Sequence, residues 1–137
     1  MTIDQTTGTV RLGEAVIRPT TSRHDFLTSS IGFTVSKVIQ NEVWETYQLQ
    51  IDEDGSWIGL KLTFEGERLD SLGFTMGPPP VSWGDWSENA INDQAKLVED
   101  FLHVTLGNPP YHFRWGKVSV VRDLRTGEGA GWIEYKK

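Results

Sequence analysis

The chain has 137 residues, of which 37% are hydrophobic and 23% are charged, as in an ordinary globular domain. Six Trp, six Phe and three Tyr argue against disorder, and the absence of Cys excludes disulfides, thiol nucleophiles and thiolate metal sites. The net charge of −6 is uneven, because residues 40–100 hold 13 acids and three bases while both flanks are net positive. An acidic middle argues against nucleic acid or an anionic membrane as partner, and it would attract a basic protein.

No apolar run approaches the roughly 18 residues that cross a bilayer, so we expect no membrane span. The first residues lack the basic and apolar segments of a signal peptide, which indicates a cytoplasmic protein. No linker or repeat divides the chain. We therefore expect a single domain over residues 1–137, with residues 1–8 frayed.

The N-terminal third contains short elements. Residues 10–17 are predicted to form a first strand. The caps offered by Pro19 to Ser22 then favour a short helix near residues 22–29. Residues 33–39 are rich in β-branched side chains and are predicted to form the next strand.

The clearest pattern lies in residues 44–64, where apolar side chains alternate on both sides of Asp54-Gly55. Asp-Gly favours a two-residue type I′ turn, because both central residues need a positive φ. With that turn, Leu49 faces Leu60, and a slip of one residue would bury Lys61 instead. Turn chemistry and periodicity thus independently predict the same hairpin.

A third strand follows, with Leu72, Phe74 and Met76 on the buried face, and the prolines of residues 78–80 end it. The longest helix is predicted over residues 87–106, with Ser87, or the pair Asp85 and Glu88, as its N-terminal cap. Its apolar face comprises Ile91, Ala95, Val98, Leu102 and Leu106.

Residues 111–121 and 131–135 are predicted to form a final hairpin, with a bulge at Gly116 where the alternation shifts. The sequence therefore predicts an α+β fold. Its core is a meandering antiparallel sheet of about six or seven strands, with the long helix packed on one face.

Recognisable catalytic motifs are absent. There is no nucleophile elbow, no phosphate-binding loop and no pair of His at metal-ligand spacing. His24, His103 and His112 are expected at a helix start, on a wet helix face and on an outward strand position. We predict no catalytic residue, no metal site, no cofactor and no enzymatic activity, although an enzyme whose site follows no motif stays an alternative.

The acids and Trp residues of the central hairpin are the candidate partner-binding surface. Trp44 and Trp57 are expected on the face opposite the apolar stripe, and exposed Trp within an acidic surface is unusual. The acids are expected at the two ends of the hairpin. The full set is Glu42, Trp44, Glu45, Asp52, Glu53, Asp54, Trp57, Glu65 and Glu67.

A second candidate surface involves Trp83 and Trp86, which flank a turn beside three prolines. Exposed aromatic residues of this kind can bind a carbohydrate or another small ligand, and they can also serve as a protein hot spot. A structural role for Trp86, as a staple against Ile91, explains it equally well.

The C-terminal half carries Phe113-x-Trp-Gly116, Asp123-x-Arg-x-Gly127 and Ile133-x-Tyr135 after a helix that ends Leu-Gly-x-Pro. This pattern resembles uncharacterised small bacterial proteins, some of which are similar to immunity proteins encoded beside polymorphic or contact-dependent toxins. Arg18-Pro19 and Asp25-Phe26-Leu27 fit the same pattern loosely. The resemblance implies a protein toxin as partner, and it assigns no catalytic residue.

These observations favour a cytoplasmic immunity-type inhibitor that binds and occludes a toxin, such as a basic nuclease, through the acidic, Trp-containing surface. A small-ligand or carbohydrate-binding domain that uses Trp83 and Trp86 is the alternative.

Overall fold

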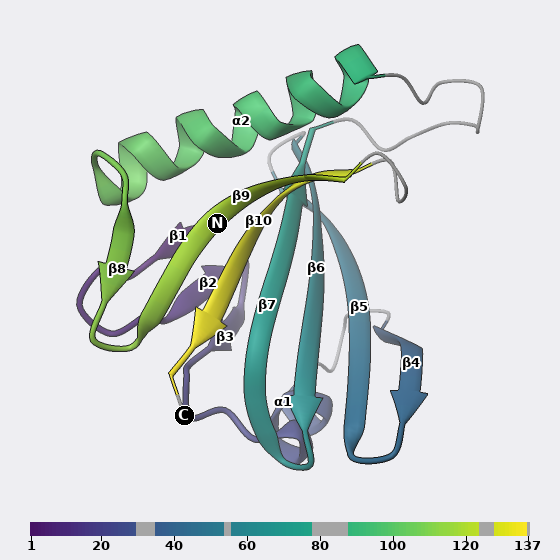
Figure 1. Ribbon diagram of the computed structural model, residues 1–137. Coiled ribbons are helices and arrows are strands. Elements are labelled where there is room, and N and C mark those ends of the chain that lie inside the picture. Colours follow the sequence, from purple (N-terminus) through teal and green to yellow (C-terminus); the bar gives the residue numbers. More distant parts are fainter. Residues whose placement is uncertain (30–34, 54–55, 78–87, 124–127, 137) are drawn as a thin grey trace.

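The computed structural model describes residues 1–29, 35–53, 56–77, 88–123 and 128–136. It shows an α+β fold, as the sequence predicts, in which a long helix lies across one end of a strongly twisted sheet (Figure 1). The elements are β1 (Thr2–Ile3), β2 (Val10–Leu12), β3 (Ala15–Ile17), α1 (Arg23–Ser29), β4 (Val35–Asn41), β5 (Trp44–Glu53), β6 (Ser56–Glu65), β7 (Arg68–Met76), α2 (Glu88–Leu106), β8 (Tyr111–Phe113), β9 (Gly116–Asp123) and β10 (Glu128–Tyr135).

The main sheet has seven antiparallel strands in the order β4-β5-β6-β7-β10-β9-β8. Five of its six neighbouring pairs are formed by strands that are consecutive in the sequence. The exception is β7 with β10, which pairs Phe74 with Gly131 and Leu72 with Ile133. This pairing joins the N-terminal meander to the C-terminal one, and it creates the continuous sheet on which the candidate site lies.

The β5–β6 hairpin has the predicted register. Leu49 pairs with Leu60 and Ile51 with Ile58, and Glu53 and Ser56 are the last partners before residues 54 and 55, which lie outside the described residues. Leu60 is fully buried and Leu49 is 2% exposed. The prediction of this hairpin from turn chemistry and alternation is therefore confirmed.

The long helix and its buried face are confirmed as well. All five predicted apolar positions of α2 are buried, and Gly107 ends the helix with a φ of +85°. The predicted caps at Asp85 and Ser87 lie outside the described residues. α2 packs mainly on β10 and β9, and Gly129 allows this approach, because a Cβ atom there would lie 2.4 Å from the carbonyl oxygen of Ile91.

The N-terminal elements are shorter and more numerous than the sequence predicts. Thr2–Ile3 pairs with β2, and Ile3 is 4% exposed. The expected single strand over residues 10–17 is a hairpin of two short strands, β2 and β3, which turns at Gly13 with a φ of +58°. Strands of two or three residues are too short to show a periodicity, so the pattern of residues 10–17 appeared continuous.

The predicted bulge at Gly116 is also wrong. Residues 111–121 form two strands, because Phe113 pairs with Gly116 across a tight turn and β8 folds back on β9. The shift in alternation marks this turn. Gly116 has a φ of +154°, and a Cβ atom there would lie 2.1 Å from the carbonyl oxygen of Glu134. Only glycine fits this close approach.

One face of the main sheet, here called the inner face, carries the hydrophobic core. Leu60, Phe74 and Ile133 point into it, together with residues of the small β1–β3 sheet, of α1 and of α2. Since side chains alternate along a strand, the residues between these core positions lie on the opposite face, here called the outer face.

Candidate functional site

The outer face contains a hollow of about 470 Å³ that spans β5, β6, β7, β10 and β9. Trp57 on β6 and Trp132 on β10 line it with outward-facing indoles, and both are half-buried. Cross-strand pairing sets their positions, because Trp132 lies opposite Gly73, and Gly73 lies opposite Lys61. Its other lining residues with outward positions are Gln48, Gly59, Thr75, Ser119, Val121, Ala130 and Glu134.

Two glycines leave the space in which the indoles pack against the sheet. A Cβ atom at residue 73 would lie 2.9 Å from Trp132 Cζ3, and one at residue 59 would lie 3.1 Å from Trp57 Cη2. Each six-membered ring therefore occupies the space above a glycine on the outer face. The two rings are placed by the backbone, as in the pairing of aromatic residues with strand glycines.

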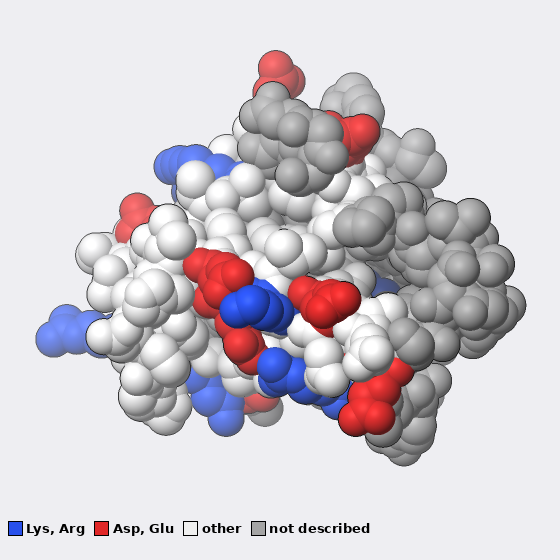
Figure 2. Space-filling view, turned by 90° about the horizontal axis from the view of Figure 1, so that it is seen from above, with Lys and Arg blue, Asp and Glu red and all other residues white. Residues whose placement is uncertain are grey.

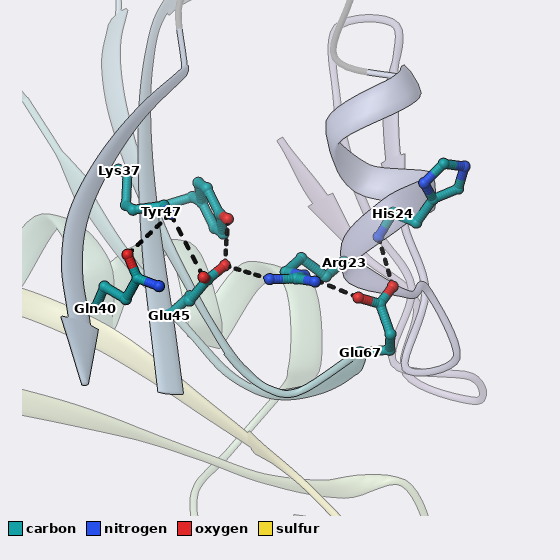
Figure 3. A network of polar contacts seen from close by, with 7 residues as sticks. All are labelled: Arg23, His24, Lys37, Gln40, Glu45, Tyr47 and Glu67. Atoms are coloured by element: carbon teal, nitrogen blue, oxygen red, sulfur yellow. Dashed lines mark hydrogen bonds and ion pairs between the residues drawn. The ribbon is translucent and has the colours of Figure 1, made fainter. Parts of the chain in front are cut away.

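A second cluster of polar side chains lies at the other end of the hairpin, where β4, β5 and the β6–β7 turn meet α1 (Figure 3). The Glu45 carboxylate accepts hydrogen bonds from Arg23 Nη1 at 2.6 Å and from the Tyr47 hydroxyl at 2.5 Å. Lys37 Nζ lies 3.4 Å from the same carboxylate. Arg23 also pairs through Nε with Glu67 at 2.8 Å, and the Glu67 carboxylate accepts the backbone N–H of His24 at 2.9 Å.

These contacts change the titration of the acids. The hydrogen bonds from Tyr47 and Arg23 lower the pKa of Glu45 to about 2. The backbone N–H of His24, at the start of α1, lowers the pKa of Glu67. Burial and the Glu45 carboxylate raise the pKa of Tyr47. Glu45 is therefore ionised at neutral pH and bound to Arg23, so it serves to attach α1 to the sheet and is unsuited to accept a proton in catalysis.

The predicted acidic surface is divided by this arrangement. Glu45 is 6% exposed and lies on the same, inner face of β5 as Tyr47. It is therefore not part of an exposed surface, which corrects that expectation. Glu67 is bound to Arg23, and Glu65 lies 3.5 Å from Arg68. Glu42 and Asp52 are exposed. Asp54 and the side chain of Glu53 lie outside what the structure describes.

The structure places only some of the predicted Trp residues. Trp44 and Trp57 lie on the outer face, as predicted, and both are half-buried. Trp83 and Trp86 lie outside the described residues. Trp132 also lies on the outer face, in the hollow, a position that was not predicted from the sequence. Trp132 precedes Ile133, which points inward, so the alternation along the strand indicated the outer face for Trp132. The sequence could not show its partner Gly73, because that residue lies 59 positions away on another strand.

The three His residues are exposed and lie on three different elements, α1, α2 and β8. Among the described residues, no three His, Asp or Glu side chains lie close enough together to hold a metal ion. No helix within the described ranges is long and apolar enough to cross a membrane.

The charges over α2 are mixed in sign. Figure 2 looks down on this side of the molecule and shows acidic and basic side chains next to one another. Arg122 of β9 contacts Glu99 of α2 at 2.5 Å, and Lys96 lies 3.8 Å from Asp100. The net negative charge of the chain is thus not concentrated over the helix.

The sequence matches no protein-family model, and no curated protein matches it at a significant level. The fold is similar to one chain of the solved structure "Rhs1-CT in complex with cognate immunity protein RhsI1". The TM-score is 0.68 at 16% sequence identity, over 99% of this chain and 87% of that chain. At this identity the two chains share a fold.

Proposed function

We propose that this protein is an immunity-type inhibitor that binds a protein toxin encoded beside it. The observation that carries the proposal is the fold, which over 99% of its length resembles a chain from a complex containing an immunity protein. The C-terminal sequence pattern supports it independently, because that pattern resembles the same class of proteins.

The described chemistry also favours binding over catalysis. The pKa of the Glu45 carboxylate is lowered to about 2, and Arg23 and Tyr47 hold this carboxylate in a network that joins α1 to the sheet. A carboxylate with a pKa of about 2 is a weak base at neutral pH. The outer face, by contrast, carries three indoles, those of Trp44, Trp57 and Trp132, on a sheet of seven strands, the type of aromatic surface that protein interfaces use.

The toxin-binding surface in this proposal is the outer side of β5 and β6. Trp44 and Trp57 supply its aromatic contacts, and Glu42 and Asp52 are its exposed acids at opposite ends of the hairpin. A basic nuclease is the toxin that such a surface suits best, because a nuclease needs Lys and Arg to hold phosphate. Charge would then speed association, while the Trp contacts would slow dissociation.

The first experiment separates inhibitor from toxin. The protein and the toxin domain encoded by the neighbouring gene are expressed separately and together in a sensitive host, and the purified pair is mixed. We expect expression of this chain alone to be harmless, co-expression to restore growth, and the two proteins to form a complex. Growth arrest by this chain alone, or no complex with the neighbouring product, would refute the proposed function.

A second experiment tests the acids. The double variant Glu42→Gln/Asp52→Asn should slow association about tenfold at low salt and leave dissociation nearly unchanged. The matched control is Glu88→Gln/Asp93→Asn, which removes two exposed charges from α2. Equal effects of the two double variants would show that only the net charge matters, and that this surface is wrongly assigned.

A further inference from the structure

We propose that the hollow between Trp57 and Trp132 is the anchor site of this interface, and that it takes one uncharged, apolar side chain of the bound toxin. This inference rests on the proposed function and adds to it the position of the main contact and the chemistry of its occupant. It extends the surface beyond β5 and β6 to β7, β10 and β9.

The first support is the fixed position of the two rings. Gly59 and Gly73 leave the space that the indoles fill, and the ladder pairs Gly73 with both Lys61 and Trp132. Rings held in this way lose little conformational entropy when a partner covers them. Interfaces concentrate their binding energy on such rigid Trp and Tyr side chains.

The second support is the charge around the hollow, which is already compensated. At its rim Glu134 lies 3.5 Å from Lys117, its cross-strand partner. Lys61, which lines the hollow, has an interaction partner as well. A charged group from the toxin would compete with these contacts and lose its hydration, so a neutral apolar side chain is the complementary occupant.

The third support concerns the kind of partner. Sites for small molecules enclose most of the ligand surface, roughly 70–90%. Here Trp57 and Trp132 lie over Gly59 and Gly73, and the hollow is open to solvent on its outer side, so a small ligand would keep part of its surface exposed. A protein partner supplies the second side itself, and the volume of about 470 Å³ leaves room for a large side chain and its neighbours.

The test measures binding of the purified neighbouring toxin domain to the full chain by surface plasmon resonance. Trp57→Ala and Trp132→Ala should each raise the Kd at least tenfold, mainly through faster dissociation, and Phe at either position should restore part of the affinity. Circular dichroism and Tm establish that each variant is folded.

Because loss of a Trp can weaken the sheet itself, a second variant adds a charge instead. Val121 lines the hollow and is 41% exposed, so Val121→Asp changes the site without removing packing from the core. We expect it to raise the Kd about tenfold. The matched control is Val104→Asp on α2, where Val104 is 86% exposed, and its Kd should stay within twofold of wild type.

The outcomes separate the two proposals. If the wild-type chain binds no neighbouring toxin, the proposed function fails and the anchor site fails with it. If the wild type binds and the folded Trp57, Trp132 and Val121 variants bind equally well, the anchor site is refuted while the proposed function stands. Equal weakening by Val121→Asp and Val104→Asp would likewise refute the anchor site. The anchor site is also refuted if the Trp variants no longer bind a small molecule that the wild type binds, while their Kd for the toxin is unchanged.

Discussion

Replacing Leu60 by Ala tests the register of the hairpin that brings Trp57 to the outer face. Leu60 is fully buried at the centre of β6, and its cross-strand neighbours Leu49 and Phe74 are 2% and 1% exposed. Both neighbours are held in their own strands by ladder hydrogen bonds, so they have little freedom to close the space left by the lost atoms. Buried Leu→Ala changes cost about 2–5 kcal/mol, and we expect about 3–4 kcal/mol here.

Unfolding in urea, followed by circular dichroism at 25 °C, measures this loss. For a chain of this length the loss corresponds to a fall in Tm on the order of 10 °C. The matched control is Leu97→Ala on α2, where the side chain is 45% exposed and Ala favours the helix, so we expect a loss under about 1 kcal/mol. If the two variants lost equal stability, Leu60 would not be a core residue and the register would be wrong by one position, with Lys61 buried.

Three further predictions follow from the polar and backbone contacts. The Glu45 carboxylate has a folded-state pKa of about 2, below its ordinary value of 4.5, so its stabilisation is present above pH 4.5 and declines as the pH falls toward 2. The difference in Tm between wild type and Glu45→Gln should therefore narrow over this range, and a constant difference would contradict the network. Gly116→Ala should cost about 2–4 kcal/mol in urea, because its Cβ would meet the Glu134 carbonyl, and an unchanged midpoint would show that the turn can relax. Joint replacement by Gln of the three exposed His residues, His24, His103 and His112, should change the free energy of unfolding by less than about 1 kcal/mol and leave toxin binding intact. Stoichiometric zinc in untagged protein would contradict the prediction that these residues have no role.

Local patterns predicted the local elements well. The β5–β6 hairpin and the buried face of α2 each combine a clear periodicity with a turn or cap signal, and both agree with the structure. The strands β1 to β3 could not be found in this way, because elements of two or three residues carry no periodicity. The shift of alternation at Gly116 was a real signal, but a bulge and a tight turn produce the same change of phase.

The candidate site depended on contacts that no local pattern contains. Trp132 meets Gly73 only because β10 pairs with β7, and Glu45 meets Arg23 only because α1 packs against the end of β5. The phase of Glu45 with Tyr47 and Leu49 did indicate an inward position. Its charge suggested a surface position instead, because a buried acid is rare unless it has a partner, and that partner lies 22 residues away.

The contacts of Trp115 affect the order in which parts of the chain can fold during synthesis. Its indole N–H donates to the carbonyl of Gln5, 110 residues earlier, and its ring lies against Gly8, whose carbonyl accepts the hydroxyl of Tyr135, 127 residues later. A ribosome makes residues 5 and 8 more than 100 residues before these partners. The pairing of β1 with β2 is local, whereas the contacts of Gln5 and Gly8 can form only after the C-terminal strands have been made. A protein fused ahead of Met1 would need a linker that lets Gln5 and Gly8 reach Trp115 and Tyr135.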